Sequence, residues 1–218
     1  MPKSLSNIVV VFDLDDTLYY ELDYQESGYN AVIDLVSEVY ECDKDRLHDL
    51  TKDGGDVLQR ICDFIGVPSA KESLLWTYRL HKPDIRLQPE AFELLEFLRD
   101  NGATILILTD GRSISQRLKL AALGLSNVEV YISDEYSSEK PDLLRFEAIC
   151  KKHVAEQHIY IGDNADKDFV APNKLGWLTV GLEPSEKSFY KADVDTITED
   201  HHPKYWVKSL KSIGDILC

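Results

Sequence analysis

The sequence contains few cysteines, and none of them lie close together. The four, Cys42, Cys62, Cys150 and Cys218, are far apart in 218 residues, and no Cys-x-x-Cys pair is present. This spacing favours free thiols in a reducing compartment over a disulfide framework or a zinc site. Internal repeats and low-complexity segments are also absent, which removes repeat architectures from consideration.

Long apolar runs and an excess of cations are missing as well. The longest apolar run is far shorter than a membrane span, and the first residues lack the apolar core of a signal peptide, so we expect a cytoplasmic protein without a membrane partner. The 24 Lys and Arg residues against 39 Asp and Glu residues give a net charge of -15. This balance argues against nucleic acid as a partner, because binding to phosphate backbones needs clustered cations. An anionic small substrate remains open if a metal ion and a few local cations line its pocket.

Hydrophobic residues make up 44% of the chain, enough for one good-sized domain or for a core domain with a smaller insertion. The most informative stretch is 8–18. Its first part, Ile8–Phe12, is apolar and rich in β-branched residues, which predicts a strand buried on both faces of a parallel sheet. Carboxylates and a threonine follow at once, at Asp13, Asp15, Asp16 and Thr17.

Asp13 and Asp15 would lie on the same side of the chain if the extended conformation continues that far. Two neighbouring carboxylates repel each other unless a cation lies between them or one keeps a proton. Mg²⁺ is a hard, oxygen-seeking cation of this kind. The simpler alternative is a strand followed by an acidic turn, in which Asp acts as a cap or turn former. We favour the metal site because Asp-x-Asp-x-Thr directly follows a wholly apolar strand.

The next part of the sequence, from about 19 to 82, shows helical patterning without a strand. Helix starts are predicted at Asp23, Asp43, Asp56 and Ser69, the last as a capping box with Glu72, and Gly66 is predicted to end the third helix. This block predicts an all-helical domain over 19–82, inserted after the first strand. Residues 1–18 and 83–218 would then form the core domain.

From residue 83 onward, helical and strand patterns alternate. Strands are predicted at 103–108, 128–132, 158–161 and 177–180, and the tail adds a weak strand at 195–198 and a helix at 204–217. Alternation of this kind implies a parallel sheet with helices on both faces. We therefore expect an α/β fold with a Rossmann-like parallel sheet of strand order about 3-2-1-4-5, whose ligand site lies at the carboxyl edge.

Polar side chains that could take part in a reaction follow the predicted strands. They are Asp13, Asp15 and Thr17 after the first strand, Thr109 after the second, Lys140 in the loop after the third, and Asp163 after the fourth. Carboxylates, a hydroxyl and an ammonium gathered at one sheet edge suit phosphoryl transfer. Each residue alone has a simpler interpretation: a strand-end threonine, a solvated loop lysine, or an aspartate that caps a helix.

With these motifs in place, the sequence resembles the haloacid dehalogenase superfamily, specifically its phosphatases with a helical cap of the first type. The resemblance covers essentially the whole chain and is carried by Asp13-Leu14-Asp15-Asp16-Thr17, Thr109-Asp110-Gly111, Lys140-Pro141 and Gly162-Asp163-Asn164-Ala165-Asp166-Lys167-Asp168. Dehalogenases of this family lack the second aspartate of the first motif, so Asp15 points to phosphate esters. Asp110 departs from the asparagine that is more usual after the threonine.

The resemblance implies a catalytic role for each matched residue. Asp13 would attack phosphorus and form an aspartyl-phosphate, and Asp15 would protonate the leaving oxygen and later deprotonate water. Thr109 and the following turn of Asp110 and Gly111 would bind phosphoryl oxygens, and Lys140 would neutralise negative charge on nucleophile and phosphate.

The resemblance also implies a Mg²⁺ site and a small substrate. Asp13, Asp163 and a backbone carbonyl, that of Asp15, would hold the ion, and Asp168 would be a further metal ligand or would orient Lys140. Near the hinges of the helical cap, Tyr20 and Arg79 are candidates for substrate contact.

The expected substrate is a small phosphomonoester such as a sugar phosphate or a nucleoside monophosphate. Three alternatives stay open: a phosphomutase with the same intermediate, a non-catalytic phosphate-binding descendant of the fold, and a receiver domain. The receiver domain is disfavoured because its acceptor aspartate follows a later strand and it has no helical insertion.

Overall fold

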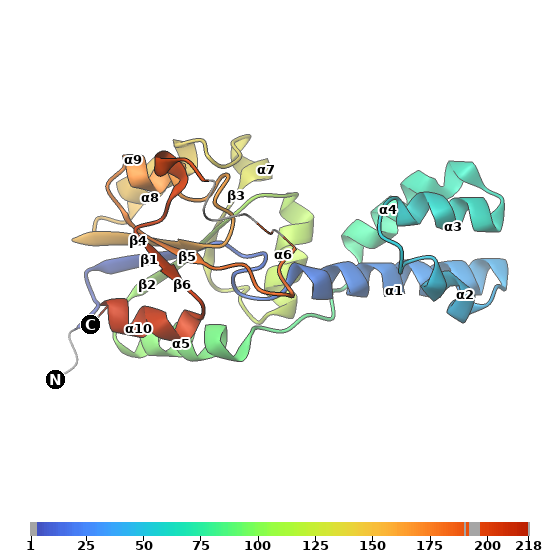
Figure 1. Cartoon of the computed structure of the whole chain (residues 1–218), viewed down its shortest axis with the longest axis horizontal. Helices are drawn as coiled ribbons and strands as arrows, with labels where there is room; N and C mark the ends of the chain where they lie inside the picture. The colour runs from blue at the N-terminus through green and yellow to red at the C-terminus, as the bar shows by residue number, and fades with distance from the viewer. Residues whose placement is uncertain (1–3, 190, 192–196, 218) are drawn as a thin grey trace. The chain divides into compact units, whose positions relative to one another are not determined.

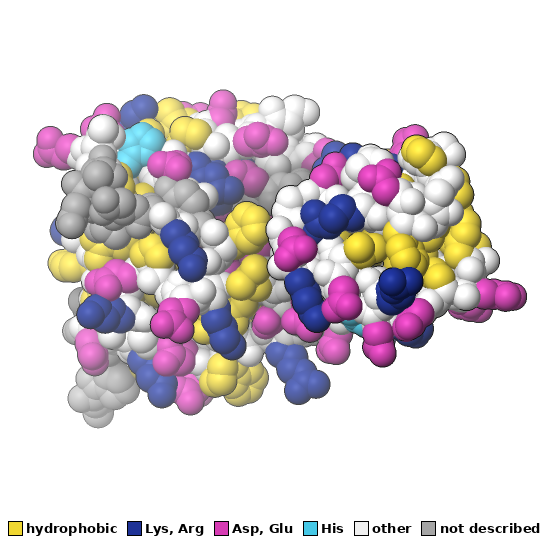
Figure 2. All heavy atoms as spheres, turned by 45° about the vertical axis from the view of Figure 1, so that its right-hand side comes forward, with side chains coloured by type: hydrophobic (Ala, Val, Ile, Leu, Met, Phe, Trp, Pro, Cys, Tyr) yellow, Lys and Arg dark blue, Asp and Glu magenta, His cyan; other side chains and the backbone are white. Residues whose placement is uncertain are grey.

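The computed structural model describes residues 4–189, 191 and 197–217, and the chain forms two compact units. The first unit combines Met1–Leu22 with Arg86–Cys218, and the second is Asp23–Ile85. Figure 1 labels the helices and strands of both units. Among the described residues, no helix is both long and apolar enough to cross a membrane. On the face drawn in Figure 2, acidic and basic side chains are interspersed.

The first unit is built on a six-stranded sheet in the order β3-β2-β1-β4-β5-β6. The strands are β1 (Ile8–Phe12), β2 (Thr104–Thr109), β3 (Glu129–Ile132), β4 (Gln157–Gly162), β5 (Leu178–Leu182) and β6 (Tyr205–Val207). Every neighbouring pair is parallel. The predicted Rossmann-like class and the order of the first five strands are confirmed.

β1 is central because it hydrogen-bonds to β2 on one side and to β4 on the other. Val10, Val11 and Phe12 are fully buried, as expected for a strand covered on both faces. Burial of each such side chain contributes about 1.5–3 kcal/mol. The carboxyl end of this stable central strand is therefore a rigid place for Asp13.

Helices cover both faces of the sheet. They are α5 (Pro89–Asp100), α6 (Ser113–Ala122), α7 (Ser133–Tyr136), α8 (Leu144–Lys152), α9 (Val170–Lys174) and α10 (Ile213–Leu217). The long helix α1 (Glu21–Tyr40) begins in the first unit and continues into the second. Figure 1 shows α5 and α10 on one side of the sheet and α8 and α9 on the other.

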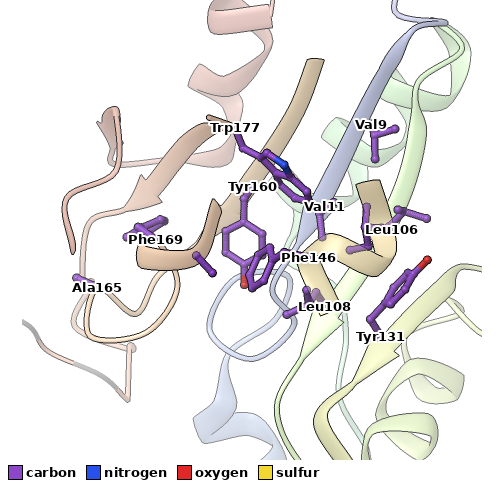
Figure 3. Packing of buried hydrophobic residues seen from close by; sticks show 12 residues of the cluster. Val9, Val11, Leu106, Leu108, Tyr131, Phe146, Tyr160, Ala165, Phe169 and Trp177 are labelled. Atoms are coloured by element: carbon purple, nitrogen blue, oxygen red, sulfur yellow. The ribbon is translucent and has the colours of Figure 1, made fainter. Parts of the chain in front are cut away.

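Alternate residues of the strands form a buried aromatic and aliphatic cluster on the α8 side of the sheet (Figure 3). The ring of Phe146 lies 5.4 Å from that of Tyr160 and 5.5 Å from that of Trp177, measured between centroids. Tyr160 extends through this cluster toward the carboxyl edge, where its hydroxyl contacts Lys140. The core thus supports the polar edge directly.

The tail of the chain differs from the predicted helix over 204–217, and that prediction is wrong for its first half. Tyr205–Val207 is strand β6, paired with β5, and α10 begins only at Ile213 after a short 3₁₀ turn. The indole of Trp206 packs against Gly181, which leaves room for it, and lies 5.9 Å from the ring of Phe169. Pairing with the open edge of β5 outweighs the local helical pattern.

The predicted weak strand at 195–198 lies partly outside the described residues. Residues 197 and 198, which the structure describes, are not in a strand.

All secondary structure described for the second unit is helical, with α2 (Lys44–Asp49), α3 (Val57–Ile65) and α4 (Lys71–Leu80) after the long α1. Two predicted caps are confirmed: Asp43 accepts a hydrogen bond from the backbone amide of Asp45, and Asp56 accepts one from that of Gln59. Gly66 ends α3 in the left-handed conformation, with φ of 72°, where glycine carries no steric penalty.

Two helix starts were predicted wrongly. α1 begins at Glu21 rather than at Asp23, because Asp16 accepts a hydrogen bond of 2.8 Å from the amide of Glu21. Ser69 does not cap α4. It lies inside the 3₁₀ turn Pro68–Ala70, which runs directly into the helix, so its side chain makes no capping hydrogen bond.

Candidate active site

Three carboxylates and one lysine meet at the carboxyl edge of the sheet. Asp13 follows β1, and Asp163 follows β4, which is its neighbour in the sheet. With Asp168 they offer carboxylate oxygens that lie within 4.8 Å of one another. Lys140 reaches this cluster from the loop between α7 and α8, with Nζ at 2.6 Å from oxygens of both Asp13 and Asp168. The structure therefore brings these four predicted residues together.

The cluster carries more negative charge than its lysine can balance. Burial raises the pKa of Asp13 to about 6 although Lys140 opposes the shift. Burial, Asp168 and Asp13 together hold the pKa of Asp163 well above its usual range. Burial opposes the charge of Lys140, but the neighbouring carboxylates Asp13 and Asp168 keep its pKa well above normal. Three buried carboxylates beside one ammonium form an oxygen donor set that fits a divalent cation such as Mg²⁺.

Asp168 differs from the other two aspartates because both of its oxygens already accept hydrogen bonds. One oxygen accepts from Lys140 Nζ and from the hydroxyl of Tyr160, and the other accepts from the amide of Asn164 at 2.8 Å. A Cβ atom at Gly162 would lie 2.4 Å from this second oxygen. The glycine therefore allows the carboxylate to approach the backbone closely.

Asp15 lies in a separate polar cluster. Its carboxylate accepts hydrogen bonds from Lys119 Nζ at 2.6 Å, from Gln116 Nε2 at 3.0 Å and from the hydroxyl of Tyr19. Burial opposes the charge of Asp15, but these donors, Lys119 first, hold its pKa below the usual range. Neither Gln116 nor Lys119 was predicted as a site residue. The available signal was two polar side chains on the buried face of a helix.

The turn after β2 is held by contacts that the sequence did not reveal. The hydroxyl oxygen of Thr109 accepts a hydrogen bond of 2.6 Å from Gln116. Gly111 has φ of 140°, and its amide donates to the hydroxyl of Ser133 at 2.9 Å. The backbone amide of Lys140 donates to the Asp110 carboxylate, at 3.2 Å from Oδ1 and 3.3 Å from Oδ2. The turn is thereby tied to α6, to α7 and to the loop that carries Lys140, as well as to β2.

Arg145 of α8 is the buried partner of Asp110. Its guanidinium is completely buried, forms an ion pair with Asp110, and donates to the carbonyls of Thr109 at 2.8 Å and Tyr131 at 3.3 Å. Among the described residues, nothing accepts a hydrogen bond from its Nε. A buried guanidinium requires a nearby negative charge. Asp110 supplies that charge.

Known proteins resemble this chain over most of its length. A model of the family described as haloacid dehalogenase-like hydrolase matches residues 10–182. The chain belongs to this hydrolase family.

Relatives of this hydrolase include two phosphatases that match it over nearly their whole length. A glyceraldehyde 3-phosphate phosphatase from Methanocaldococcus jannaschii is 26% identical, with 95% of this chain and 96% of the relative covered. A ribulose-1,5-bisphosphate 5-phosphatase from Halopiger xanaduensis is also 26% identical, with 95% and 98% covered. The predictions of an enzyme and of a phosphatase of this superfamily are confirmed at the level of the family.

A solved structure shares the fold of the hydrolase. A haloacid dehalogenase-type hydrolase from Bacillus subtilis superposes with a TM-score of 0.66 at 20% identity, and 97% of this chain and 98% of that chain are covered.

Two further predicted residues are not members of the carboxylate cluster. Tyr20 of this hydrolase is half-buried and lines a cavity of about 340 Å³ together with Asp16 and Asp163. Arg79 belongs to the second unit, where its guanidinium lies 5.5 Å from the ring centroid of Trp76. Substrate contact by Tyr20 and Arg79 stays a prediction.

Loss of the Arg145 guanidinium should destabilise the hydrolase strongly. In Arg145→Met the largely buried Asp110 carboxylate keeps only the longer ion pair with Lys167, at 3.6 Å, among the described residues. The carbonyls of Thr109 and Tyr131 also lose a buried donor, so we expect the free energy of unfolding to fall by about 3–5 kcal/mol. Urea denaturation measures this change. Arg99→Met, which breaks an exposed pair with Glu96, should cost no more than about 1 kcal/mol. Equal losses in the two variants would contradict the assignment.

Between about pH 5 and pH 6, titration of Asp13 and Asp163 should lower the stability of the metal-free hydrolase as the pH rises. The pKa of Asp13 is about 6 in the folded chain against an ordinary 3.8, so between these values the folded state holds more protons than the unfolded state. Raising the pH then lowers the free energy of unfolding, and Asp163 shifts in the same direction.

A Mg²⁺ ion held by these carboxylates would need them ionised, so added Mg²⁺ should raise Tm more at about pH 7.5 than at about pH 5. Thermal unfolding with and without Mg²⁺ at both values measures this difference, and Asp163→Asn should diminish the gain. An equal Mg²⁺ effect at the two pH values would be incompatible with ion binding by these carboxylates.

Proposed function

We propose that this chain is a Mg²⁺-dependent phosphomonoester hydrolase that acts through an aspartyl-phosphate on Asp13. The observation that carries the proposal is the buried cluster at the carboxyl edge, where Asp13 contacts Lys140 beside Asp163 and Asp168. A nucleophilic carboxylate, a neutralising ammonium and a metal-binding donor set in one place are the requirements of phosphoryl transfer. The names of the relatives, both phosphatases of small phosphorylated sugars, support the same class.

In the first step an oxygen of Asp13 attacks phosphorus and the ester P–O bond breaks. The leaving oxygen takes a proton from Asp15, and the phosphoryl group stays on Asp13. In the second step water attacks phosphorus, its proton passes to Asp15, and the bond to Asp13 breaks to release phosphate. Lys140 stabilises the charge on Asp13 and on the transferring group throughout.

Mg²⁺ would be held by the carboxylates of Asp13 and Asp163 and by the backbone carbonyl of Asp15. When bound, it neutralises the negative charge shared by the nucleophile and the phosphoryl oxygens. Asp168 has both oxygens engaged, so we assign it to orienting Lys140 rather than to the ion. The solved structure from Bacillus subtilis is described as bound to magnesium, which supports the choice of ion.

The proposed substrate is a small sugar phosphate. The relatives named above are phosphatases of a three-carbon and a five-carbon sugar phosphate. Neither of these two names supports a nucleoside monophosphate, the other substrate that the sequence analysis expected. The helical unit Asp23–Ile85 would act as the cap that closes over the substrate and excludes water, with Tyr20 and Arg79 as contacts.

Phosphate release from a panel of esters, each with and without Mg²⁺, tests the function. We expect the highest turnover on a sugar phosphate and loss of turnover in excess chelator. Undiminished turnover in chelator would contradict the metal's role. Transfer of phosphate between positions of a bisphosphorylated sugar, without release, would show a mutase instead.

Substitution of the two aspartates of the first motif should separate nucleophile from acid and base. Asp13→Asn removes the nucleophile, so no phosphoenzyme should form on any ester. Asp15→Asn should lower turnover of alkyl phosphates by about 10²–10⁴-fold. With nitrophenyl phosphate, whose leaving group needs little protonation, Asp15→Asn should show a burst, since hydrolysis of the intermediate still lacks its base.

Rapid quenching followed by mass spectrometry measures the trapped phosphoenzyme. If both variants lost activity equally on every ester, with no intermediate trapped in Asp15→Asn, the acid and base role would belong to another residue.

A further inference from the structure

The buried face of α6 carries two long polar side chains, although helix faces that pack on a core are usually apolar. Gln116 is 2% exposed and Lys119 is 6% exposed, and both lie beside the apolar Leu120. They are three residues apart and therefore project from the same side of the helix. Burial of an amide and an ammonium is costly unless each is paired. Here both side chains contact Asp15, and Gln116 also contacts Thr109; both partners are proposed site residues.

Lys119 holds the Asp15 carboxylate from the direction of α6. Its Nζ is 2.6 Å from Oδ1 of Asp15, and the Tyr19 hydroxyl donates to the same oxygen. The ammonium also lies 5.9 Å from the ring centroid of Tyr19. Charge-assisted hydrogen bonds of this kind are short and directional. An ammonium anchored on a packed helix therefore restricts the orientation of the carboxylate.

Gln116 links Asp15 to the turn after β2. Its Nε2 lies 3.0 Å from Oδ2 of Asp15, 2.6 Å from the hydroxyl oxygen of Thr109 and 2.8 Å from the carbonyl of Asp110. The Thr109 hydroxyl accepts this hydrogen bond, so its single hydrogen remains available for another acceptor, such as a phosphoryl oxygen.

Gly111 makes this linkage possible. A Cβ atom at this position would lie 3.1 Å from both Cδ and Nε2 of Gln116, which is tighter than an ordinary contact. Glycine at this position therefore allows the positive φ of the turn and leaves space for the side-chain amide of Gln116.

We propose that Gln116 and Lys119 are positioning residues, which fix the Asp15 carboxylate and the Thr109 hydroxyl in one relative orientation for phosphoryl transfer. This inference rests on the proposed function, because it assigns proton transfer to Asp15 and phosphate binding to Thr109. It adds a helix outside the four motifs to the site. Neither side chain is required to touch the reacting atoms.

A double-mutant cycle tests the role of Lys119. Lys119→Met should lower kcat for an alkyl phosphate by about 10–100-fold while KM changes less than about threefold, and Lys119→Arg should recover most of the loss. In the Asp15→Asn background, Lys119→Met should cost less than about twofold, since the group that it positions is already disabled.

Arg117→Met is the matched control, because Arg117 lies on the same helix but pairs with the exposed Glu135; it should leave kcat unchanged. An equal loss from Lys119→Met in both backgrounds, or a loss from Arg117→Met of the same size, would overturn the proposal.

Inhibition by inorganic phosphate tests the role of Gln116 separately. Gln116→Leu should raise the inhibition constant of phosphate by about three- to tenfold, the equivalent of one hydrogen bond, because the Thr109 hydroxyl loses its orienting donor. Lys119→Met should leave that constant unchanged. An unaltered constant in Gln116→Leu would remove Gln116 from the proposal.

Crystal structures of the variants give a readout that does not depend on turnover. The Asp15 carboxylate should leave its orientation in Lys119→Met and keep it in Lys119→Arg and Arg117→Met. An unchanged carboxylate in Lys119→Met would overturn the positioning role. Lys119→Gln, which keeps a polar group in the buried position, provides the same comparison if the methionine variant does not fold. Absence of turnover in the wild type would instead contradict the proposed function.

Discussion

Repulsion among Asp13, Asp163 and Asp168 is the constraint on which the edge of the sheet depends. The sheet forces the first two together, because β1 and β4 are parallel neighbours and an aspartate directly follows each strand. Burial prevents water from screening their charges, and Lys140 balances only part of them. This local instability lies at the end of the buried central strand β1, where the surrounding core can support it.

Asp13 and Asp15 lie two residues apart but in opposite electrostatic surroundings. Burial raises the pKa of Asp13 toward 6, whereas Lys119 and its neighbours outweigh burial at Asp15 and lower its pKa. Two carboxylates kept in different surroundings can take different roles in one reaction. In the proposed reaction, Lys140 and a bound Mg²⁺ would keep Asp13 ionised as the nucleophile. Asp15 must carry a proton when the ester bond breaks, and its lowered pKa favours the basic form that accepts the proton of water in the second step.

The wrong predictions for the fold concern residues whose structure is set by something other than the local apolar periodicity. Tyr205–Val207 was assigned to a helix from local pattern, but the open edge of β5 recruits it as a strand. Ser69 has the spacing of a capping residue, yet Pro68 places it in a 3₁₀ turn that leads directly into α4. The local periodicity of the sequence predicts neither the free edge of β5 nor the path of the 3₁₀ turn.

The sequence by itself determined the parallel sheet, the helical insertion and the residues at the strand ends, such as Asp13, Thr109 and Asp163. These are local signals, since each polar residue directly follows the apolar run that forms its strand. Only the tertiary structure decided that Lys119 meets Asp15 and that Arg145 meets Asp110, across 104 and 35 residues of sequence. The physical reason is that the partner of a buried charge depends on which helix face packs over which strand, and that packing is settled only when the whole sheet has assembled.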